Sequence, residues 1–186
     1  MTDNHRNETG FPSSEESPDQ PHVIGVHGAI QQRAIAAQAL SEALRAVTNA
    51  EATTEFLDLA ELELPLYNPD RPEPEDAVAF TQKISRADAV VVATSVRHGS
   101  FPALLKTALD YCDPEDIDNK PVGLVAVAEG SGPAFALDHL RTVFKTLNAR
   151  VLPIQVSINA TWKTNELPEG SVNALWKLGQ EIVDER

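Results

Sequence analysis

The 186-residue sequence is short of cysteine, of aromatic residues and of basic residues. Its single cysteine, Cys112, excludes a disulfide framework and favours an intracellular setting. Aromatic residues make up 5% of the chain, too few for a platform on which nucleic-acid bases would stack. Lys and Arg number 15 against 28 Asp and Glu, and the formal net charge of -13 disfavours binding to nucleic acid or to an anionic membrane.

The excess of acidic residues has two interpretations. It is the composition of a protein adapted to a high-salt cytoplasm, where salt screens the self-repulsion, and equally that of an ordinary acidic bacterial protein. No apolar run reaches the roughly 20 residues that span a bilayer. Residues 1–21, MTDNHRNETGFPSSEESPDQP, lack the apolar stretch of a signal peptide. We therefore predict a cytoplasmic protein with a disordered acidic leader over residues 1–21 and a single domain over residues 22–186.

From His22 onward, short apolar runs alternate with segments whose apolar residues recur at helical spacing. The expected strands are residues 22–27, 54–59, 89–94, 121–127 and 151–158. The expected helices are residues 30–47, 77–85, 102–110, 135–147 and 171–183. Continuous apolar strands between amphipathic helices are typical of a parallel sheet covered on both faces. We therefore predict an α/β domain with a doubly wound, five-stranded parallel sheet in the order 2-1-3-4-5.

This strand order predicts where a ligand would lie. The winding of the chain reverses between the first and third strands, so a crevice is expected beyond their carboxyl ends. The segments that follow these ends are residues 28–34 and 94–101. The loop after the fourth strand, residues 129–132, is expected to form a third wall.

The first of these segments, GAIQQRA, joins a strand to a helix. Backbone N–H groups at the start of a helix attract anions, so a bound phosphate is one interpretation; a glycine turn that only closes the unit is the other. The segment matches neither the G-x-G-x-x-G pattern of dinucleotide sites nor the G-x-x-x-x-G-K-[ST] pattern of nucleotide triphosphatases.

The second segment, residues 94–101, carries more polar groups. Gly99 allows a ligand to approach the backbone closely, and Thr94 and Ser100 supply hydroxyls. Arg97 and His98 either face a ligand or extend into solvent. Pro102 suits the first turn of the helix that follows.

The sequence offers no evident nucleophile, acid–base pair or metal site. Ser131 lacks the glycines of a G-x-S-x-G turn, and the five histidines do not form an H-E-x-x-H pattern. The acidic residues 113–118 do not have the spacing of a calcium loop and are interpreted as a solvated turn. We therefore assign no catalytic residue and no metal ligand, and expect a bound cofactor to carry the chemistry.

The stretch ATSVRHGSFPALLKTALDY, residues 93–111, resembles the NADPH-dependent FMN reductases, a family of flavodoxin-like enzymes that includes quinone and azo-dye reductases. The positions that match the motif of this family are Thr94, His98, Gly99, Ser100, Pro102, Leu105, Lys106, Ala108, Leu109, Asp110 and Tyr111. The segments LPLYNPD, residues 64–70, and NKPVGLVAV, residues 119–127, are also similar, and the resemblance spans residues 23–158. It implies a flavodoxin-like three-layer α/β sandwich.

The resemblance implies FMN as cofactor, NADPH or NADH as electron donor, a small acceptor such as free flavin or a quinone, and a homodimer or homotetramer. The residues implied at the FMN phosphate are Gly28, Ala29, Gln31, Arg33 and Ala34. Those implied along one edge of the flavin ring are Thr94, Ser95, Val96, Arg97, His98, Gly99 and Ser100. Those implied on its pyrimidine side are Glu129, Gly130, Ser131 and Gly132. Lys106 and Asp110 are expected to serve helix packing or a subunit contact instead.

The phosphate segment departs from the family pattern, which is close to G-S-x-R-x-x-S-x-N. The residues at the matching positions are Gly28, Ala29, Gln31, Ala34 and Ala36, so two serines, an arginine and an asparagine are missing. In the ring segment, Ser95 and Arg97 replace the usual proline and tyrosine. One hydrogen bond to a charged group contributes roughly 1.5–3 kcal/mol, so losing several weakens FMN binding by orders of magnitude unless other donors replace them.

Two functional hypotheses follow. The first is an FMN-dependent NAD(P)H oxidoreductase in which backbone N–H groups, Arg33, Gln31 or Gln32 hold the phosphate. The second is a weak or non-enzymatic flavin-binding or interaction protein that has lost tight phosphate binding. A receiver domain of the response-regulator type shares the topology, but His27 and Thr94 stand where it needs acidic residues.

Overall fold

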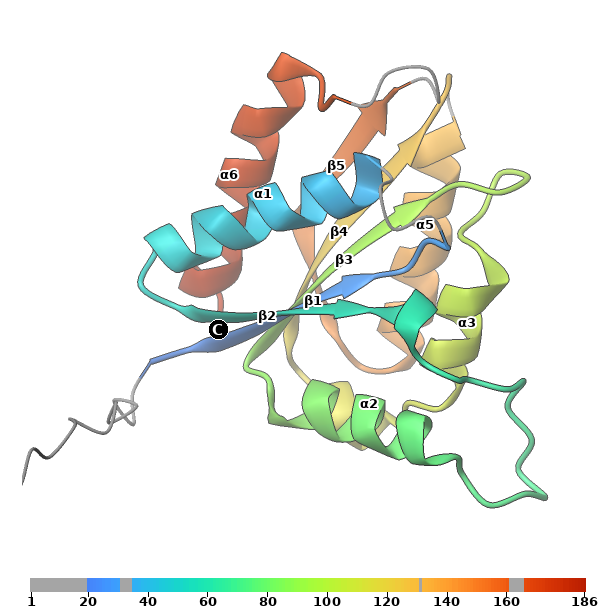
Figure 1. The fold of residues 1–186 in the computed structure, drawn as a ribbon. Coiled ribbons are helices and arrows are strands. Elements are labelled where there is room, and N and C mark those ends of the chain that lie inside the picture. Colours follow the sequence, from blue (N-terminus) through green and yellow to red (C-terminus); the bar gives the residue numbers. More distant parts are fainter. Residues whose placement is uncertain (1–19, 31–34, 131, 161–165) are drawn as a thin grey trace, which may run out of the picture.

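The computed structural model describes residues 20–30, 35–130, 132–160 and 166–186. Its centre is a five-stranded parallel sheet in the order β2-β1-β3-β4-β5, which confirms the predicted topology (Figure 1). The strands are β1 (His22–His27), β2 (Thr53–Asp58), β3 (Ala89–Ser95), β4 (Pro121–Ala128) and β5 (Arg150–Asn159). The leader predicted over residues 1–21 lies, apart from Gln20 and Pro21, outside the described residues.

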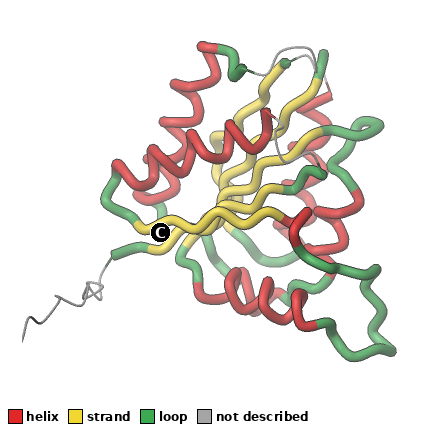
Figure 2. Tube along the Cα trace, in the orientation of Figure 1, coloured by secondary structure: helices red, strands yellow, loops and turns green. Residues whose placement is uncertain are grey.

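Helices cover both faces of the sheet and make a three-layer sandwich (Figures 1 and 2). Helices α1 (Ile35–Asn49) and α6 (Glu169–Asp184) lie on one face. Helices α2 (Glu75–Arg86), α3 (Ala103–Asp110) and α5 (Gly132–Thr146) lie on the other, with the short α4 (Pro114–Ile117) beside α2. None of the helices in the described ranges is long and apolar enough to cross a membrane.

Two short helices were not predicted. The acidic turn at residues 113–118 contains α4, which begins with a capping box in which the backbone N–H of Asp113 donates to the carboxylate of Asp116 at 2.9 Å. Ile117 on this turn is buried, so the segment is anchored to the core. Leu59, predicted to end the second strand, instead opens a 3-10 helix, η1 (Leu59–Glu61), capped by the Asp58 carboxylate. A single turn is too short to reveal a helical period in the sequence.

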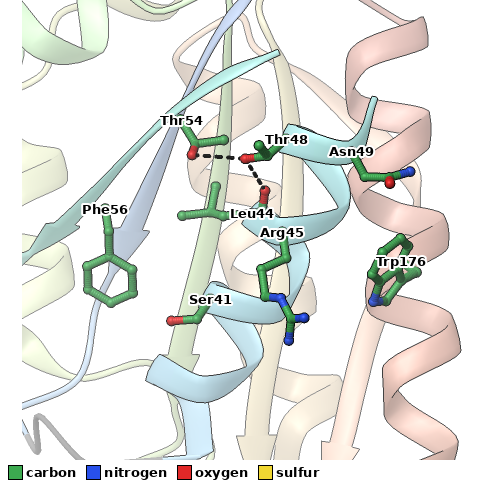
Figure 3. Close-up of a pocket in the computed structure, with 8 residues that line it drawn as sticks. All are labelled: Ser41, Leu44, Arg45, Thr48, Asn49, Thr54, Phe56 and Trp176. Atoms are coloured by element: carbon green, nitrogen blue, oxygen red, sulfur yellow. Dashed lines mark hydrogen bonds between the residues drawn. The ribbon is translucent and has the colours of Figure 1, made fainter. Parts of the chain in front are cut away.

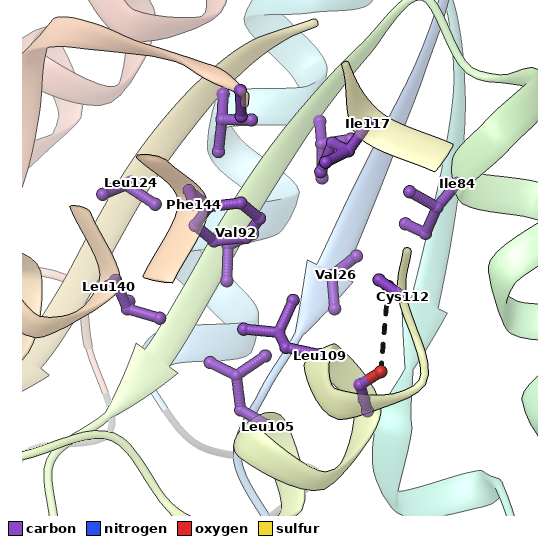
Figure 4. Packing of buried hydrophobic residues seen from close by; sticks show 14 of the residues in the cluster. Val26, Ile84, Val92, Leu105, Leu109, Cys112, Ile117, Leu124, Leu140 and Phe144 are labelled. Atoms are coloured by element: carbon purple, nitrogen blue, oxygen red, sulfur yellow. Dashed lines mark hydrogen bonds between the residues drawn. The ribbon is translucent and has the colours of Figure 1, made fainter. Parts of the chain in front are cut away.

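The central strand β3 explains why the apolar runs are continuous. Val90 and Val92 face the layer of α2, α3 and α5, whereas Val91 and Ala93 face the layer of α1 and α6. Successive side chains of a strand point to opposite faces, so a strand covered on both faces must be apolar at every position. Figure 4 shows Val92 packed with side chains of α3 and α5, such as Leu105 and Phe144.

The edge strand β2 is covered less well. Leu57 is buried, but Phe56 on the opposite face is 42% exposed. Among the described residues no strand pairs with the outer side of β2, and α1 covers its face only in part. An exposed phenylalanine at this edge is therefore compatible with the apolar pattern of the strand.

Cys112 is buried among apolar residues, and its thiol lies 3.8 Å from the carbonyl oxygen of Ala108 (Figure 4). Burial, and after it the carboxylates of Asp116, Asp113 and Asp110, together raise the pKa of this thiol to about 12. The thiolate is the reactive form of cysteine. Cys112 is therefore a packing residue rather than a nucleophile.

We accordingly expect the native protein to resist alkylation at neutral pH, because almost none of its thiol is ionised or accessible. Labelling with iodoacetamide should become fast only after urea unfolds the chain. Mass spectrometry of the labelled chain measures both rates. Rapid labelling of the folded protein would contradict the burial of Cys112.

Helices α1 and α6 approach closely at Gly179. A Cβ atom at this position would lie 2.5 Å from the carbonyl oxygen of Ala43 and 2.6 Å from the Cβ atom of Ala46. At Gly170, in the first turn of the same helix, a Cβ atom would meet nothing within 4 Å. These two glycines form a matched pair for testing the packing of this layer.

Gly179→Ala should lower the free energy of unfolding by about 1–3 kcal/mol, because overpacking outweighs the better helix propensity of alanine. Gly170→Ala should leave stability unchanged or raise it by up to about 1 kcal/mol. Urea titration followed by circular dichroism measures both values. Equal stabilities of the two variants would show that α1 and α6 do not pack as described.

Candidate functional site

The ends of β1 and β3 are joined at the carboxyl edge of the sheet. The backbone N–H of Gly28 donates to the carbonyl oxygen of Ala93 at 2.9 Å, and the hydroxyl of Thr94 donates to the carbonyl oxygen of Gly28 at 3.0 Å. Thr94 is fully buried. A Cβ atom at position 28 would lie 2.7 Å from Cδ2 of Leu105, so only glycine permits this approach to α3. The two segments predicted to flank a crevice therefore start side by side.

After β3 the chain makes a tight two-residue turn. The backbones of Arg97 and Ser100 exchange two hydrogen bonds, of 2.7 and 3.0 Å. Between them, His98 has a φ of 50° and Gly99 a φ of 80°, the pattern of a type I′ turn. Within the described chain, the backbone N–H groups of these two central residues have no recorded partner. A Cβ atom at Gly99 would meet nothing within 4 Å. The turn thus offers two donors and open space to a flat polar ligand.

The loop after β4 lies against the same turn. Its Gly130 N–H is bound to the Asn159 side-chain oxygen at 3.1 Å, and the Val96 N–H donates to the carbonyl oxygen of Val127 at 3.2 Å. A Cβ atom at Gly132 would lie 3.5 Å from Cγ1 of Val96. The loops after β3 and β4 are therefore neighbours, as the strand order predicted.

A histidine on α5 anchors the turn and was not recognised from the sequence. Nδ1 of His139 lies 3.0 Å from the Ser100 hydroxyl oxygen, a contact between residues 39 positions apart. Phe135, one helical turn before His139, is 55% exposed. The sequence shows His139 only as a polar residue on a helix, and nothing local to it indicates a partner in another loop.

A second unforeseen pair lies at the ends of β1 and β2. Nδ1 of His27 is 3.1 Å from a carboxylate oxygen of Asp58, and the His27 side chain is 0% exposed. In the sequence, the only indication of this pair is that both strands end on a polar residue. It predicts a contact only once the two strands are known to be neighbours in register, with His27 opposite Asp58.

The remaining predicted site residues fall into two groups. Ala29 is buried directly after β1, Ser95 is half-buried at the end of β3, and Arg97, His98 and Glu129 are exposed. Gln31, Arg33, Ala34 and Ser131 lie outside the described residues. Lys106 and Asp110, expected to serve helix packing, form an ion pair with each other on α3.

A groove of about 560 Å³ lies elsewhere on the molecule (Figure 3). It is lined by Ser41, Leu44, Arg45, Thr48, Asn49, Thr54, Phe56 and Trp176. These residues belong to the second half of α1, to β2 and to α6, away from the carboxyl edge of the sheet. Arg45 and Trp176 both donate to the Glu42 carboxylate, and the Thr48 hydroxyl donates to the Leu44 carbonyl oxygen. Arg45, Thr48 and Trp176 thus already donate to other groups of the protein.

Comparison with known proteins identifies the family. Residues 21–163 match the model of the NADPH-dependent FMN reductase family, and the chain belongs to this family. It is 35% identical over 108 residues to an NADPH azoreductase of a Bacillus species, which covers 56% of this chain and 61% of that protein. It is 35% identical over 78 residues to an FMN-dependent NADPH-azoreductase of Staphylococcus haemolyticus, which covers 42% of each chain. The chain spans about half the length of the curated relatives it matches.

Solved structures agree on the fold. An oxidoreductase from Corynebacterium diphtheriae superposes with a TM-score of 0.75 at 22% identity, over 89% of this chain and 96% of that chain. The apo form of an NADH:FMN oxidoreductase gives 0.73 at 18% identity, over 88% of each chain. A flavodoxin from the Archaea gives 0.64 at 10% identity, over 88% of this chain and 96% of that chain. The fold is therefore flavodoxin-like.

Two substitutions at Gly99 distinguish the effect of changing the backbone conformation of the turn from the effect of filling the open space beside it. Asparagine tolerates the positive φ of this position, whereas the β-branched valine does not. If a flavin ring lies against the turn, both Gly99→Val and Gly99→Asn should weaken FMN binding by at least about tenfold, since either side chain enters the open space. Fluorescence titration with FMN measures the loss, and Gly170→Ala is the control. Undiminished binding by both variants would show that the ring lies elsewhere.

Proposed function

We propose that this chain is an FMN-dependent oxidoreductase that receives a hydride from NADH or NADPH and passes the electrons to a small acceptor. The observation that carries this proposal is the turn at residues 97–100. It presents two unpaired backbone N–H groups beside open space, next to the loop after β4, in a member of the FMN reductase family.

The residues at the carboxyl edge fit a flavin. The turn supplies N–H donors for the carbonyl oxygens of a planar ring, and the absence of a side chain at Gly99 permits face or edge contact with it. Gly28 and Ala29 precede α1 in the sequence. The N-terminus of a helix attracts anions, so we place the phosphate of FMN near the start of α1. Bound FMN would supply the hydride transfer itself. The protein residues bind and orient the ring.

The nature of the acceptor is proposed only by class. The relatives named above are azoreductases, and another relative, from Pseudomonas fluorescens, is an NADH-dependent FMN reductase. We propose a small planar oxidant such as free flavin, a quinone or an azo compound. We further propose that the protein acts as a homodimer or homotetramer in the cytoplasm.

A weak or non-enzymatic flavin binder is the second candidate. The observation that favours it is Ala29, which is buried directly after Gly28 and brings no hydroxyl to the phosphate segment. This candidate shares the ring site with the first and differs in its affinity for FMN and in its turnover.

The visible spectrum of the purified protein, with and without added FMN, tests the proposal. We expect a flavin spectrum that bleaches when NADH or NADPH is added without oxygen, and whose colour returns with an added quinone or azo dye. Gly99→Val should bind less flavin and serves as the comparison. Bound flavin that neither nucleotide reduces would favour the second candidate, and no binding at micromolar FMN in dilute or concentrated salt would contradict both.

A further inference from the structure

A large aromatic side chain is left uncovered at the start of α5. Phe135 lies in the first turn of this helix and is 55% exposed. The next two residues, Ala136 and Leu137, are fully buried, so this part of α5 is packed against the core while the Phe135 ring is directed away from it. The fold of the described chain therefore leaves this ring available for contact with another molecule.

Two contacts fix the position of Phe135 relative to the turn that follows β3. At the start of α5, a Cβ atom at Gly132 would lie 3.5 Å from Cγ1 of Val96, which directly precedes the turn. Further along α5, Nδ1 of His139 lies 3.0 Å from the hydroxyl oxygen of Ser100, the last residue of the turn. Residues 132, 135 and 139 have the spacing i, i+3, i+7 and share one face of the helix. Phe135 therefore lies between the two contacts, on the face of α5 that meets the turn (Figure 1).

The other exposed phenylalanine and tyrosine side chains of the described residues have different surroundings. Phe56 lies on β2 beside the groove of Figure 3, away from the carboxyl edge of the sheet. Tyr67 packs edge-on against Tyr111, with the ring centroids 5.3 Å apart. No such ring contact involves Phe135 within the described chain. Phe135 is thus an exposed aromatic ring beside the candidate site, without an aromatic partner in the described part of the protein.

The surroundings of Phe135 combine a few polar groups with apolar side chains. The polar groups are the backbone N–H groups of His98 and Gly99, which have no recorded partner within the described chain. Val96 and Phe101, on either side of the turn, are apolar and only partly buried. This combination is typical of a site for a small molecule, and aromatic side chains pair with planar rings in offset or edge-to-face geometry. A planar substrate that reaches a flavin at this turn would therefore lie next to Phe135.

We propose that Phe135 determines substrate specificity in this protein by contacting the planar ring that exchanges electrons with the flavin. This inference rests on the proposed function. The nicotinamide ring of NADH or NADPH and the ring of a quinone or azo acceptor have this chemistry in common, because each is flat and each must approach the flavin. The aromatic contact stabilises the bound ring and favours planar substrates over those without a ring.

The test compares electron acceptors with and without a planar ring. Menadione is a planar naphthoquinone, whereas ferricyanide is an octahedral ion. With menadione varied, KM reports the contact with the acceptor; with NADH or NADPH varied and ferricyanide as acceptor, KM reports the contact with the nicotinamide. Phe135→Ala should raise at least one of these two KM values roughly 3- to 10-fold, the effect of losing one aromatic contact, and leave kcat and the KM for ferricyanide unchanged.

Two further variants serve as controls. Phe135→Trp keeps an aromatic ring and should restore KM values close to those of the wild type. Phe56→Ala removes a ring that is 42% exposed but lies on β2, away from the candidate site, and should change none of the KM values. Circular dichroism and fluorescence titration with FMN show whether each variant is folded and binds flavin.

The outcomes distinguish this inference from the proposed function. If the wild-type protein binds no FMN, or if neither nucleotide reduces the bound flavin, both are contradicted. If the wild type turns over and Phe135→Ala leaves the KM values for menadione and for the nucleotide unchanged, the role of Phe135 is overturned and the proposed function stands. The same conclusion follows if Phe135→Ala raises the KM for ferricyanide equally. A changed oligomeric state of that variant in gel filtration would then assign Phe135 to a subunit contact.

Discussion

The hydrogen bond from the Thr94 hydroxyl to the carbonyl oxygen of Gly28 joins the two strands between which the sheet reverses its winding. Since both groups are buried, leaving either unpaired would cost about 1–3 kcal/mol. The bond therefore determines where the chain leaves β1 and where it leaves β3. The turn at residues 97–100 and the beginning of the phosphate segment both start from this point.

The part of the candidate site that we propose for the flavin ring offers mainly backbone groups. Two adjacent residues with positive φ expose their N–H groups, and the absence of a side chain at Gly99 leaves room above them. Such a site tolerates the replacement of neighbouring side chains, as at Ser95 and Arg97. Its donors are backbone N–H groups, which every residue except proline has. The family pattern of the segment proposed for the phosphate contains more side-chain donors, and four of them are missing from this sequence.

The apolar runs predicted the five strands because both faces of the sheet are covered. The helical spacing of apolar residues predicted α1, α2, α3, α5 and α6. The observed ends of the elements differ from the predicted ones where a local cap sets the boundary. For example, η1 begins where the Asp58 carboxylate accepts a hydrogen bond from the backbone N–H of Ala60. The sequence predicts a ligand loop at residues 94–101, which stays a prediction. It does not predict the φ angles of the turn or the contact with His139, because that partner is 39 positions away in the sequence.

By itself, the sequence determined the layers, the strand order and the loops that meet at the carboxyl edge, because these depend on periodicity and on the handedness of parallel crossovers. Only the tertiary structure brought His27 to Asp58 and His139 to Ser100. Each pair joins elements whose proximity arises from strand register or helix placement, which no local pattern encodes. The partner that each histidine side chain contacts is therefore decided only by the fold.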